Sequence, residues 1–397
     1  MSSLKLQRTS TKGLSEQELN KLIQQNKGIK KQYYDAEYVE SINEHLFSGM
    51  VANYFRPEFI GFEEYPERNN EKIPLIFASN HSGMAFPWDA MVFGSGFYQL
   101  CEGRKKRHIK ALTAPTLSEI KLMNTYMIND FWKRIGGIDA TSLNFETMMH
   151  NESHDILIYP EGIPGIGKGF NNRYKLQRFS TSFIRMSLKF KTDIIPVFSI
   201  NGEYINPYSY RSKTLNSIVN KVGIPYLPIG IFTLLIPIFP WVFYFGMPAK
   251  FYFVKGRRIK PHEMVAADYD KLEDLSNEEI ESIRDEVHRL MQEDITEAVI
   301  KYGQQPYQWK DLFKKWRTNI KKFWFYFPPT WHFAFLEHER QYLNYKKTGK
   351  PVKMKSGFGA IFSWIIKNPF ALFYYLPIIG FIPLAIRGYS GSKKVEK

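Results

Sequence analysis

Five short apolar runs, each the length of a β-strand, constrain the fold of this chain more than any other feature. Most of them are followed by a Gly, Pro or Asn, as strands usually are. The intervals between them are long enough for helices, and strands that alternate with helices form a sheet with helices on its faces. We therefore predict an α/β fold with a central, mostly parallel sheet covered by helices. The five runs are Pro74–Ala78, Ile109–Leu112, Ile156–Tyr159, Ile194–Ile200 and Lys250–Val254.

Capping patterns predict two helices and help to divide the chain. Ser276 and Glu279 have the spacing of a capping box, and apolar residues then recur at helical spacing until Gly303, which predicts a helix over 276–302. Ser15 and Glu18 have the same spacing and predict a short amphipathic helix that packs on the rest of the protein. We expect an N-terminal helical extension (1–70), a central α/β domain that includes the 276–302 helix (71–305), and a C-terminal extension (306–397).

Two stretches without charged residues stand apart from this pattern. The first covers Val222–Ala249 and the second covers 368–386. The first is long enough for a helix to cross a bilayer, but prolines interrupt both stretches and break any regular helix. We expect both to dip into one leaflet of a membrane or to line an apolar groove, with a buried core loop as the alternative for the first. The C-terminal extension mixes aromatic residues with Lys and Arg, which is typical of a membrane interface, although a helical appendage packed on the central domain is the alternative.

The composition narrows the classes of function. The net charge is +15 and aromatic residues make up 16% of the chain, a combination that suits either nucleic acid or an anionic membrane surface. Because no recognition helix, RNA-binding sheet motif or zinc finger is recognisable, we expect no nucleic-acid partner. The single cysteine, Cys101, excludes a disulfide framework, a Cys-ligated zinc site and an iron–sulfur cluster. His150 and His154 are four positions apart, but no third ligand lies nearby, so we predict no metal site.

A histidine and an aspartate follow the first predicted strand. His81 lies on a Gly-containing turn, where α/β folds often place catalytic groups, and seven residues separate it from Asp89. An Asp can accept a hydrogen bond from one ring nitrogen of a His and leave the other nitrogen free to act as a base. A turn around Pro87 would bring the two side chains together. A surface turn without function is the plain alternative.

A second element supports a catalytic interpretation. The strand that ends at Tyr159 is followed by Pro160-Glu161-Gly162 and then by a glycine-rich loop that reaches Lys168. Backbone N–H groups of such a loop can bind an anion or a developing oxyanion. Basic residues, beginning with Arg173, come directly after the loop and suit a ligand that carries phosphate.

These motifs together resemble the glycerolipid acyltransferases, the family of lysophosphatidate and glycerol-phosphate acyltransferases. Four blocks match in order between about Ile73 and Ile259: Asn80-His81 with Asp89, Phe131 to Ala140, Tyr159-Pro160-Glu161-Gly162, and Ile195-Pro196-Val197. Two departures are present. The usual His-to-Asp spacing in the family is four intervening residues, and the usual continuation of the third block is Glu-Gly-Thr-Arg, where this chain has Glu161-Gly162-Ile163-Pro164.

The resemblance implies an acyltransferase-like fold and a role for each matching residue. His81 would be the general base and Asp89 would hold its tautomer. Lys168 or Arg173 would take the place of the missing Arg and bind phosphate. Because that Arg is missing, the acceptor is left open between a lysophospholipid and an uncharged alcohol such as diacylglycerol. The residues expected to contact substrate are Asn80, Ser82, Gly83, Arg134, Glu161, Gly162, Lys168 and Arg173.

The function implied by the resemblance is acyl transfer from a thioester to the hydroxyl of a glycerolipid. The donor would be acyl-CoA or an acyl carrier protein, and no further cofactor would be needed because the thioester is already activated. A membrane or lipid-binding protein that has lost catalysis on the same fold is the alternative. The N-terminus has no apolar run resembling a signal peptide, so we expect association with the cytoplasmic face of a membrane and contact with its lipids. The sequence carries no prediction of the oligomeric state.

Overall fold

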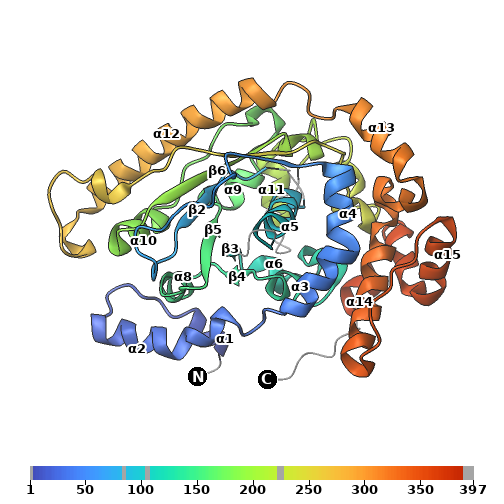
Figure 1. The fold of residues 1–397 in the computed structure, drawn as a ribbon, viewed down its shortest axis with the longest axis horizontal. Coiled ribbons are helices and arrows are strands. Elements are labelled where there is room, and N and C mark those ends of the chain that lie inside the picture. The colour runs from blue at the N-terminus through green and yellow to red at the C-terminus, as the bar shows by residue number, and fades with distance from the viewer. Residues whose placement is uncertain (1–2, 83–85, 103–107, 221–227, 388–397) are drawn as a thin grey trace.

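A seven-stranded sheet forms the centre of the protein (Figure 1). The computed structural model describes residues 3–82, 86–102, 108–220 and 228–387. The strand order is β1-β7-β6-β2-β5-β3-β4, and every neighbouring pair is parallel except β6 and β7. The strands are β1 (Glu58–Ile60), β2 (Ile76–Ser79), β3 (His108–Thr113), β4 (Ile138–Asp139), β5 (His154–Ile158), β6 (Ile194–Ile200) and β7 (Tyr252–Lys255).

The predicted α/β fold with a mostly parallel, helix-covered sheet is confirmed at this level. The five apolar runs correspond to β2, β3, β5, β6 and β7, with ends that differ by at most two residues. The strands β1 and β4 were not predicted, because three and two residues are too few to show an alternating or continuous apolar pattern. Strand β1 lies within the range predicted as an N-terminal extension and pairs with β7 at the edge of the sheet.

Helices cover both faces of the sheet, which explains why every residue of β6 is buried. On one face, α5 packs over Phe77 and Leu157; on the other, α8, α10 and α12 pack over Ile76 and Ile156. The helices of the molecule are α1 (Ser3–Gln7), α2 (Glu16–Asn26), α3 (Ala36–Ile42), α4 (Ser48–Met50), α5 (Trp88–Glu102), α6 (Thr116–Glu119), α7 (Phe131–Arg134), α8 (Ser142–Met149), α9 (Ile163–Ile166), α10 (Ser182–Phe190), α11 (Lys213–Asn220), α12 (Asn277–Tyr302), α13 (Trp309–Thr318), α14 (Trp331–Thr348), α15 (Phe358–Lys367) and α16 (Phe381–Arg387).

The two helices predicted from capping patterns are present. Ser15 and Glu18 form a full capping box at the start of α2. Ser276 caps α12 by accepting from the N–H of Glu279 at 3.1 Å. The Glu279 carboxylate instead accepts from the N–H of Ala266 at 3.3 Å, so the predicted box is half formed at this helix.

The C-terminal extension packs on the outer side of the α3 and α4 helices (Figure 1). Its buried residues, among them Trp331, Trp364 and Tyr374, belong to the same apolar core as the α5 face of the sheet. This matches the alternative of a helical appendage on the central domain for much of the extension.

The two uncharged stretches are built from short turns. The first contains the 3₁₀ turns η8 (Thr233–Leu235) and η9 (Pro240–Tyr244), and its residues 222–227 lie outside the described part of the chain. The second contains the 3₁₀ segment η14 (Pro369–Tyr375) and most of α16. Among the residues that the structure describes, none of the helices combines the length and the apolar character needed to cross a bilayer.

Two histidines of α14 make stability depend on pH. Burial lowers the pKa of His332 to about 3, and burial, with the nearby charges of His45 and Arg134, lowers the pKa of His338 to about 3. Within the described part of the chain, neither ring nitrogen of His332 has a hydrogen-bond partner. In the unfolded chain both groups regain an ordinary pKa of about 6.5. Below that value the unfolded chain therefore binds protons that the folded protein excludes until about pH 3.

We expect the free energy of unfolding to fall as the pH decreases through this range. Each buried ring contributes up to about 1.4 kcal/mol per pH unit. Urea unfolding at about pH 7, 6 and 5 measures the slope, and His332→Phe should reduce the slope by about the share of one group. A His332→Phe variant that loses stability on acidification as steeply as the wild type would contradict this assignment.

Candidate functional site

His81 and Asp89 meet at the end of the central strand β2. His81 lies on the turn after β2, and Asp89 is in the first turn of α5. The Nδ1 atom of His81 lies 3.0 Å from Oδ2 of Asp89, which also accepts from the N–H of Ser82 at 2.9 Å. Asp89 is fully buried, whereas the His81 side chain is 16% exposed. Because the carboxylate can only accept, Nδ1 carries the proton and Nε2 is the basic nitrogen.

The Glu161 carboxylate holds the turn that carries His81. Its Oε1 accepts from the N–H of His81 at 2.9 Å, and its Oε2 accepts from the N–H of Gln177 at 2.7 Å. Glu161 is buried. We predicted that Glu161 would contact substrate, but both of its carboxylate oxygens accept hydrogen bonds from the backbone. In this structure Glu161 fixes the position of His81.

Lys168 lies inside the protein beside two carboxylates. Its side chain is 1% exposed, and its Nζ is 3.5 Å from Oε1 of Glu203 and 3.8 Å from Oε2 of Glu161. Burial raises the pKa of Glu203, and the Lys168 charge opposes that rise. We predicted that Lys168 would bind phosphate, but the structure directs its charge to these buried carboxylates and away from the surface.

Asn80 and Ser82 connect β2 to β6. The Asn80 amide accepts from the N–H of Ser199 at 2.8 Å and donates to its carbonyl at 3.2 Å, and the hydroxyls of Ser82 and Ser199 lie 3.3 Å apart. Both Asn80 and Ser82 are buried. Their contacts with Ser199 hold the turn that carries His81 against β6. Gly83, the next residue predicted to contact substrate, lies outside the described residues.

The glycine-rich loop binds the N–H groups of its three glycines internally. The N–H groups of Gly162, Gly165 and Gly167 donate to the carbonyls of Tyr159, Gly162 and Ile163, respectively. Gly162 has φ +58°, a conformation that favours glycine. The N–H groups at these three glycines are therefore engaged, and the expectation that they bind an anion does not fit their hydrogen bonding.

Gly165 allows the loop to approach His81 closely. A Cβ atom at this position would lie 2.5 Å from Cβ of Glu161 and 3.1 Å from Cβ of His81. We expect Gly165→Ala to displace both residues and to lower turnover by roughly tenfold to hundredfold, because small displacements of a catalytic group are costly. Steady-state rates measure the effect. Gly28→Ala is the matched control, since a Cβ there meets nothing within 4 Å, and an unchanged rate in Gly165→Ala would contradict the argument.

The two predicted arginines occupy different places. Arg134 pairs with Glu339 of α14 at 2.8 Å and stacks over the ring of Tyr38, so it joins the C-terminal extension to the central domain. It is not among the described residues that line the cavity beside His81. Arg173 is exposed and lies over the ring of Phe170, 5.0 Å from its centre. Of the predicted basic substrate contacts, Arg173 alone is exposed.

A large, mostly apolar cavity opens beside His81. Its volume is about 440 Å³. It begins at the carboxyl ends of β2 and β5 and reaches the first residues of β3 and β5, and so runs the length of β3. Six residues of parallel strand span about 16 Å at about 3.3 Å per residue. Lining residues include His81, Tyr159 and Ile163 at one end, Ala111 halfway along β3, and Tyr98 and His108 at the other end, with Met91 and Leu117 also in the wall.

Sequence reasoning missed several residues that shape this site. The ring of Tyr159 stacks on His81 at 3.9 Å between centres, and Ser199 and Glu203 bind the predicted residues from β6 and the turn after it. Tyr159 was noted as the end of a strand and as the start of the Pro-Glu-Gly block, without a role of its own. Its place directly before the Pro-Glu-Gly block was the one signal that could have identified it.

The remaining candidates do not form a site. No group of three His, Cys, Asp or Glu side chains that could hold a metal ion occurs within the described ranges. Cys101 is buried near the end of α5. His154 begins β5, and burial, followed by the charge of Lys110, lowers its pKa to about 3.

Comparison with known proteins gives relatives without an assigned activity. The chain is 25% identical over 265 residues to an uncharacterized protein of Mycobacterium tuberculosis (strain ATCC 25618 / H37Rv), which covers 65% of this chain and 68% of that protein. It is 24% identical over 272 residues to an uncharacterized protein of Mycobacterium leprae (strain TN), which covers 65% of this chain and 66% of the relative. No family model matches the chain, and no solved structure matches it.

Proposed function

We propose that this protein is an acyltransferase that moves a fatty acyl group from a thioester donor to the hydroxyl of a glycerolipid. The observation that carries the proposal is the His81–Asp89 pair at the mouth of a long apolar cavity. A histidine oriented by a buried carboxylate is a general base, and an apolar cavity that begins at that base accommodates an alkyl chain. The motifs that resemble the glycerolipid acyltransferases support the same reaction.

The proposed step uses His81 and the thioester alone. Nε2 of His81 removes the proton from the acceptor hydroxyl while that oxygen attacks the thioester carbonyl carbon. The carbon–sulfur bond then breaks, and the imidazolium returns its proton to the departing thiolate, so the products are an ester and a free thiol. Asp89 keeps the proton on Nδ1 and offsets the charge of the imidazolium. The donor is acyl-CoA or an acyl carrier protein, and the step requires no metal.

The acyl chain of the donor would occupy the cavity. Its carbonyl carbon would lie near His81 and Gly162, and its methyl end would point along β3 towards His108. A length of about 16 Å is suited to a medium or long chain. We therefore expect the rate of acyl transfer to differ between octanoyl, palmitoyl and oleoyl donors. Equal rates would show that the acyl chain does not enter the cavity.

An uncharged acceptor is the second candidate, and the position of Lys168 favours it. The lysine predicted to bind phosphate is 1% exposed and faces Glu161 and Glu203. Arg173 is then the first of the exposed basic residues that follow the loop. A lysophospholipid would rely on Arg173, whereas a mono- or diacylglycerol would need no such contact.

A turnover assay with defined donors and acceptors tests the proposal. The purified protein is incubated with oleoyl-CoA and, in parallel, with lysophosphatidate, monoacylglycerol or diacylglycerol. The proposal expects ester and free CoA to form in equal amounts with at least one acceptor. Release of CoA without ester formation would show a thioesterase instead. Binding of lipids without turnover of any acceptor would support the alternative of a lipid-binding protein.

A further inference from the structure

The two uncharged stretches, which lie far apart in the sequence, meet in the structure. The N–H of Ile378 donates to the carbonyl of Ile238 at 2.7 Å, and the aromatic rings of Tyr244 and Tyr374 pack together beneath this contact. We call the exposed aliphatic residues on either side of it the aliphatic face. They are Ile231, Leu234 and Leu235 from the first stretch, and Ile378, Ile379 and Ile382 from the second.

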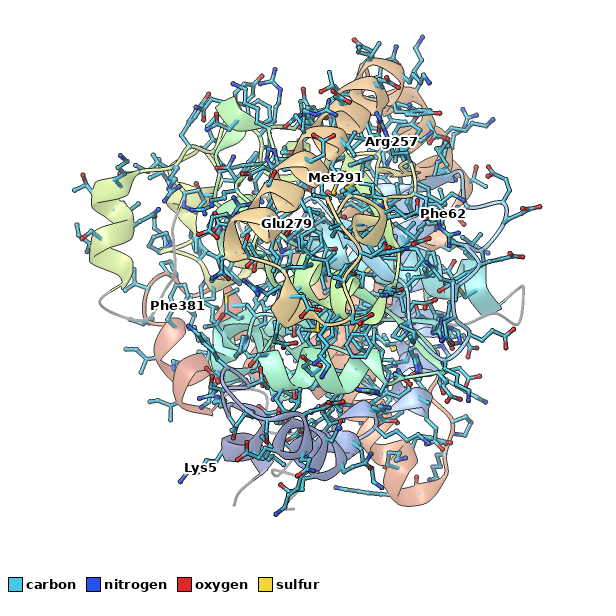
Figure 2. All side chains as sticks on the ribbon, turned by 90° about the vertical axis from the view of Figure 1, so that its left-hand side faces the viewer. Lys5, Phe62, Arg257, Glu279, Met291 and Phe381 are labelled. Atoms are coloured by element: carbon cyan, nitrogen blue, oxygen red, sulfur yellow. The ribbon has the colours of Figure 1, made fainter. Side chains whose placement is uncertain are left out.

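The side chains of the aliphatic face are unusually exposed for their type. Ile231 is 68% exposed, and Ile378, Ile379 and Ile382 are each 60% exposed or more. Figure 2 shows Phe381, which lies between Ile379 and Ile382 in sequence, in the lower left of the molecule and on the opposite side from Phe62. Clusters of exposed apolar residues mark surfaces that bind a partner or a membrane.

The two segments of the chain that contain the aliphatic face have no acidic residues. From Tyr204 to His262 the sequence contains no Asp or Glu, and the same is true from Arg340 to Val395. Both stretches of the aliphatic face lie inside these two segments. The segments carry the basic residues Arg211, Lys213, Lys221, Lys250, Lys255, Arg257, Arg258, Lys260, Arg340, Lys346, Lys347, Lys350, Lys353, Lys355, Lys367, Arg387, Lys393 and Lys394. Acidic residues from other parts of the chain pair with Lys250, Arg257, Arg258, Lys260, Arg340, Lys346 and Lys367.

The exposed Ile and Leu residues, together with the basic segments, favour a membrane over a protein as the partner of the aliphatic face. A second copy of the chain would place basic segments against basic segments, which repel each other. Protein-binding surfaces concentrate their energy in Trp, Tyr and Arg, whereas the aliphatic face presents Ile and Leu, which partition readily into hydrocarbon. Lys and Arg next to such residues attract anionic headgroups. We propose that the aliphatic face docks this protein on the surface of an anionic bilayer, with its Ile and Leu side chains inserted into one leaflet.

Docking at this surface would place the candidate site beside the membrane. The first stretch packs directly on the turn that leads to Asp89: the indole N–H of Trp88 donates to the carbonyl of Tyr244 at 3.1 Å, and Phe86 contacts the same tyrosine. The benefit of this placement for a lipid substrate rests on the proposed function. The docking itself does not, because it needs only the aliphatic face and the basic segments.

Vesicle flotation tests the docking. The full chain is mixed with vesicles of phosphatidylcholine alone or of equal parts phosphatidylcholine and phosphatidylglycerol. We expect it to float with the anionic vesicles and to float much less with the neutral ones. A triple variant with Ile231→Ser, Ile378→Ser and Ile382→Ser should bind the anionic vesicles about tenfold or more weakly, because buried methylene groups drive insertion. Ile300→Ser is the matched control, since Ile300 is 65% exposed on α12.

The outcomes separate docking from catalysis. The triple variant should retain the wild-type thermal unfolding and, if the proposed function holds, the wild-type rate on a short-chain acceptor in solution. Equal flotation of the wild type and the triple variant would overturn the docking proposal. The docking proposal would also be overturned if the wild type did not bind vesicles and the substitutions instead dissociated a dimer. Flotation without acyl transfer to any acceptor would leave the docking intact and refute the proposed function.

Discussion

Replacement of His81 by Ala is expected to lower acyl transfer by about a thousandfold, because a positioned general base contributes roughly a hundredfold to ten-thousandfold. The rate is measured as formation of labelled ester from oleoyl-CoA and the best acceptor. His81 lines the cavity, and its Nδ1 atom is held by Asp89 at 3.0 Å. The loss should appear mainly in kcat, since the imidazole stabilises the transition state more than the bound substrate.

A matched histidine provides the control for this experiment. The His262 side chain is also 16% exposed and faces a buried aspartate, with its Nε2 atom 3.9 Å from Oδ1 of Asp193. His262→Ala removes an equivalent side chain away from the cavity and should retain the wild-type rate. The unfolding curve of His81→Ala must show a folded protein. Wild-type turnover by a folded His81→Ala variant would refute the proposed mechanism.

The parts of the fold that could be predicted are those with local signals. Strands buried on both faces are continuous apolar runs, so β6 was recognisable over its whole length. The α12 helix was recognisable from its N-cap and its apolar spacing. Strands β1 and β4 depend on pairing with distant residues, such as Glu58 with Tyr252, and two or three residues carry no local pattern of their own.

The same distinction applies to the candidate site. His81 and Asp89 are close in sequence, and the structure brings them together as predicted. Arg134 belongs to a block that resembles a substrate-binding motif, but its partner Glu339 lies 205 positions away, so its ion pair was not visible. The cavity was equally hidden, because the apolar residues that line it have the same composition as a packed core.

For Lys168, the role predicted from the sequence differs most from the contacts in the structure. The substitution Lys168→Met should reveal its role. The substitution leaves the buried carboxylates of Glu161 and Glu203 together without a cation, and an uncompensated buried charge costs about 3–5 kcal/mol of the free energy of unfolding. Lys346→Met is the control, because this lysine forms an exposed pair with Glu37 that contributes about 0–1 kcal/mol. Urea unfolding measures both.

The pH dependence and a second substitution identify the cause of that loss. Without Lys168, burial and repulsion from Glu161 both raise the pKa of Glu203 in the folded protein above its value in the unfolded chain. The folded state then binds more protons, so the deficit of Lys168→Met should shrink at about pH 5 and grow at about pH 8. Adding Glu203→Gln should recover much of the stability at neutral pH, because one charge remains where two repelled. If Lys168 instead bound a substrate phosphate, Lys168→Met would keep wild-type stability and raise the KM for a phosphorylated acceptor, and Glu203→Gln would rescue nothing.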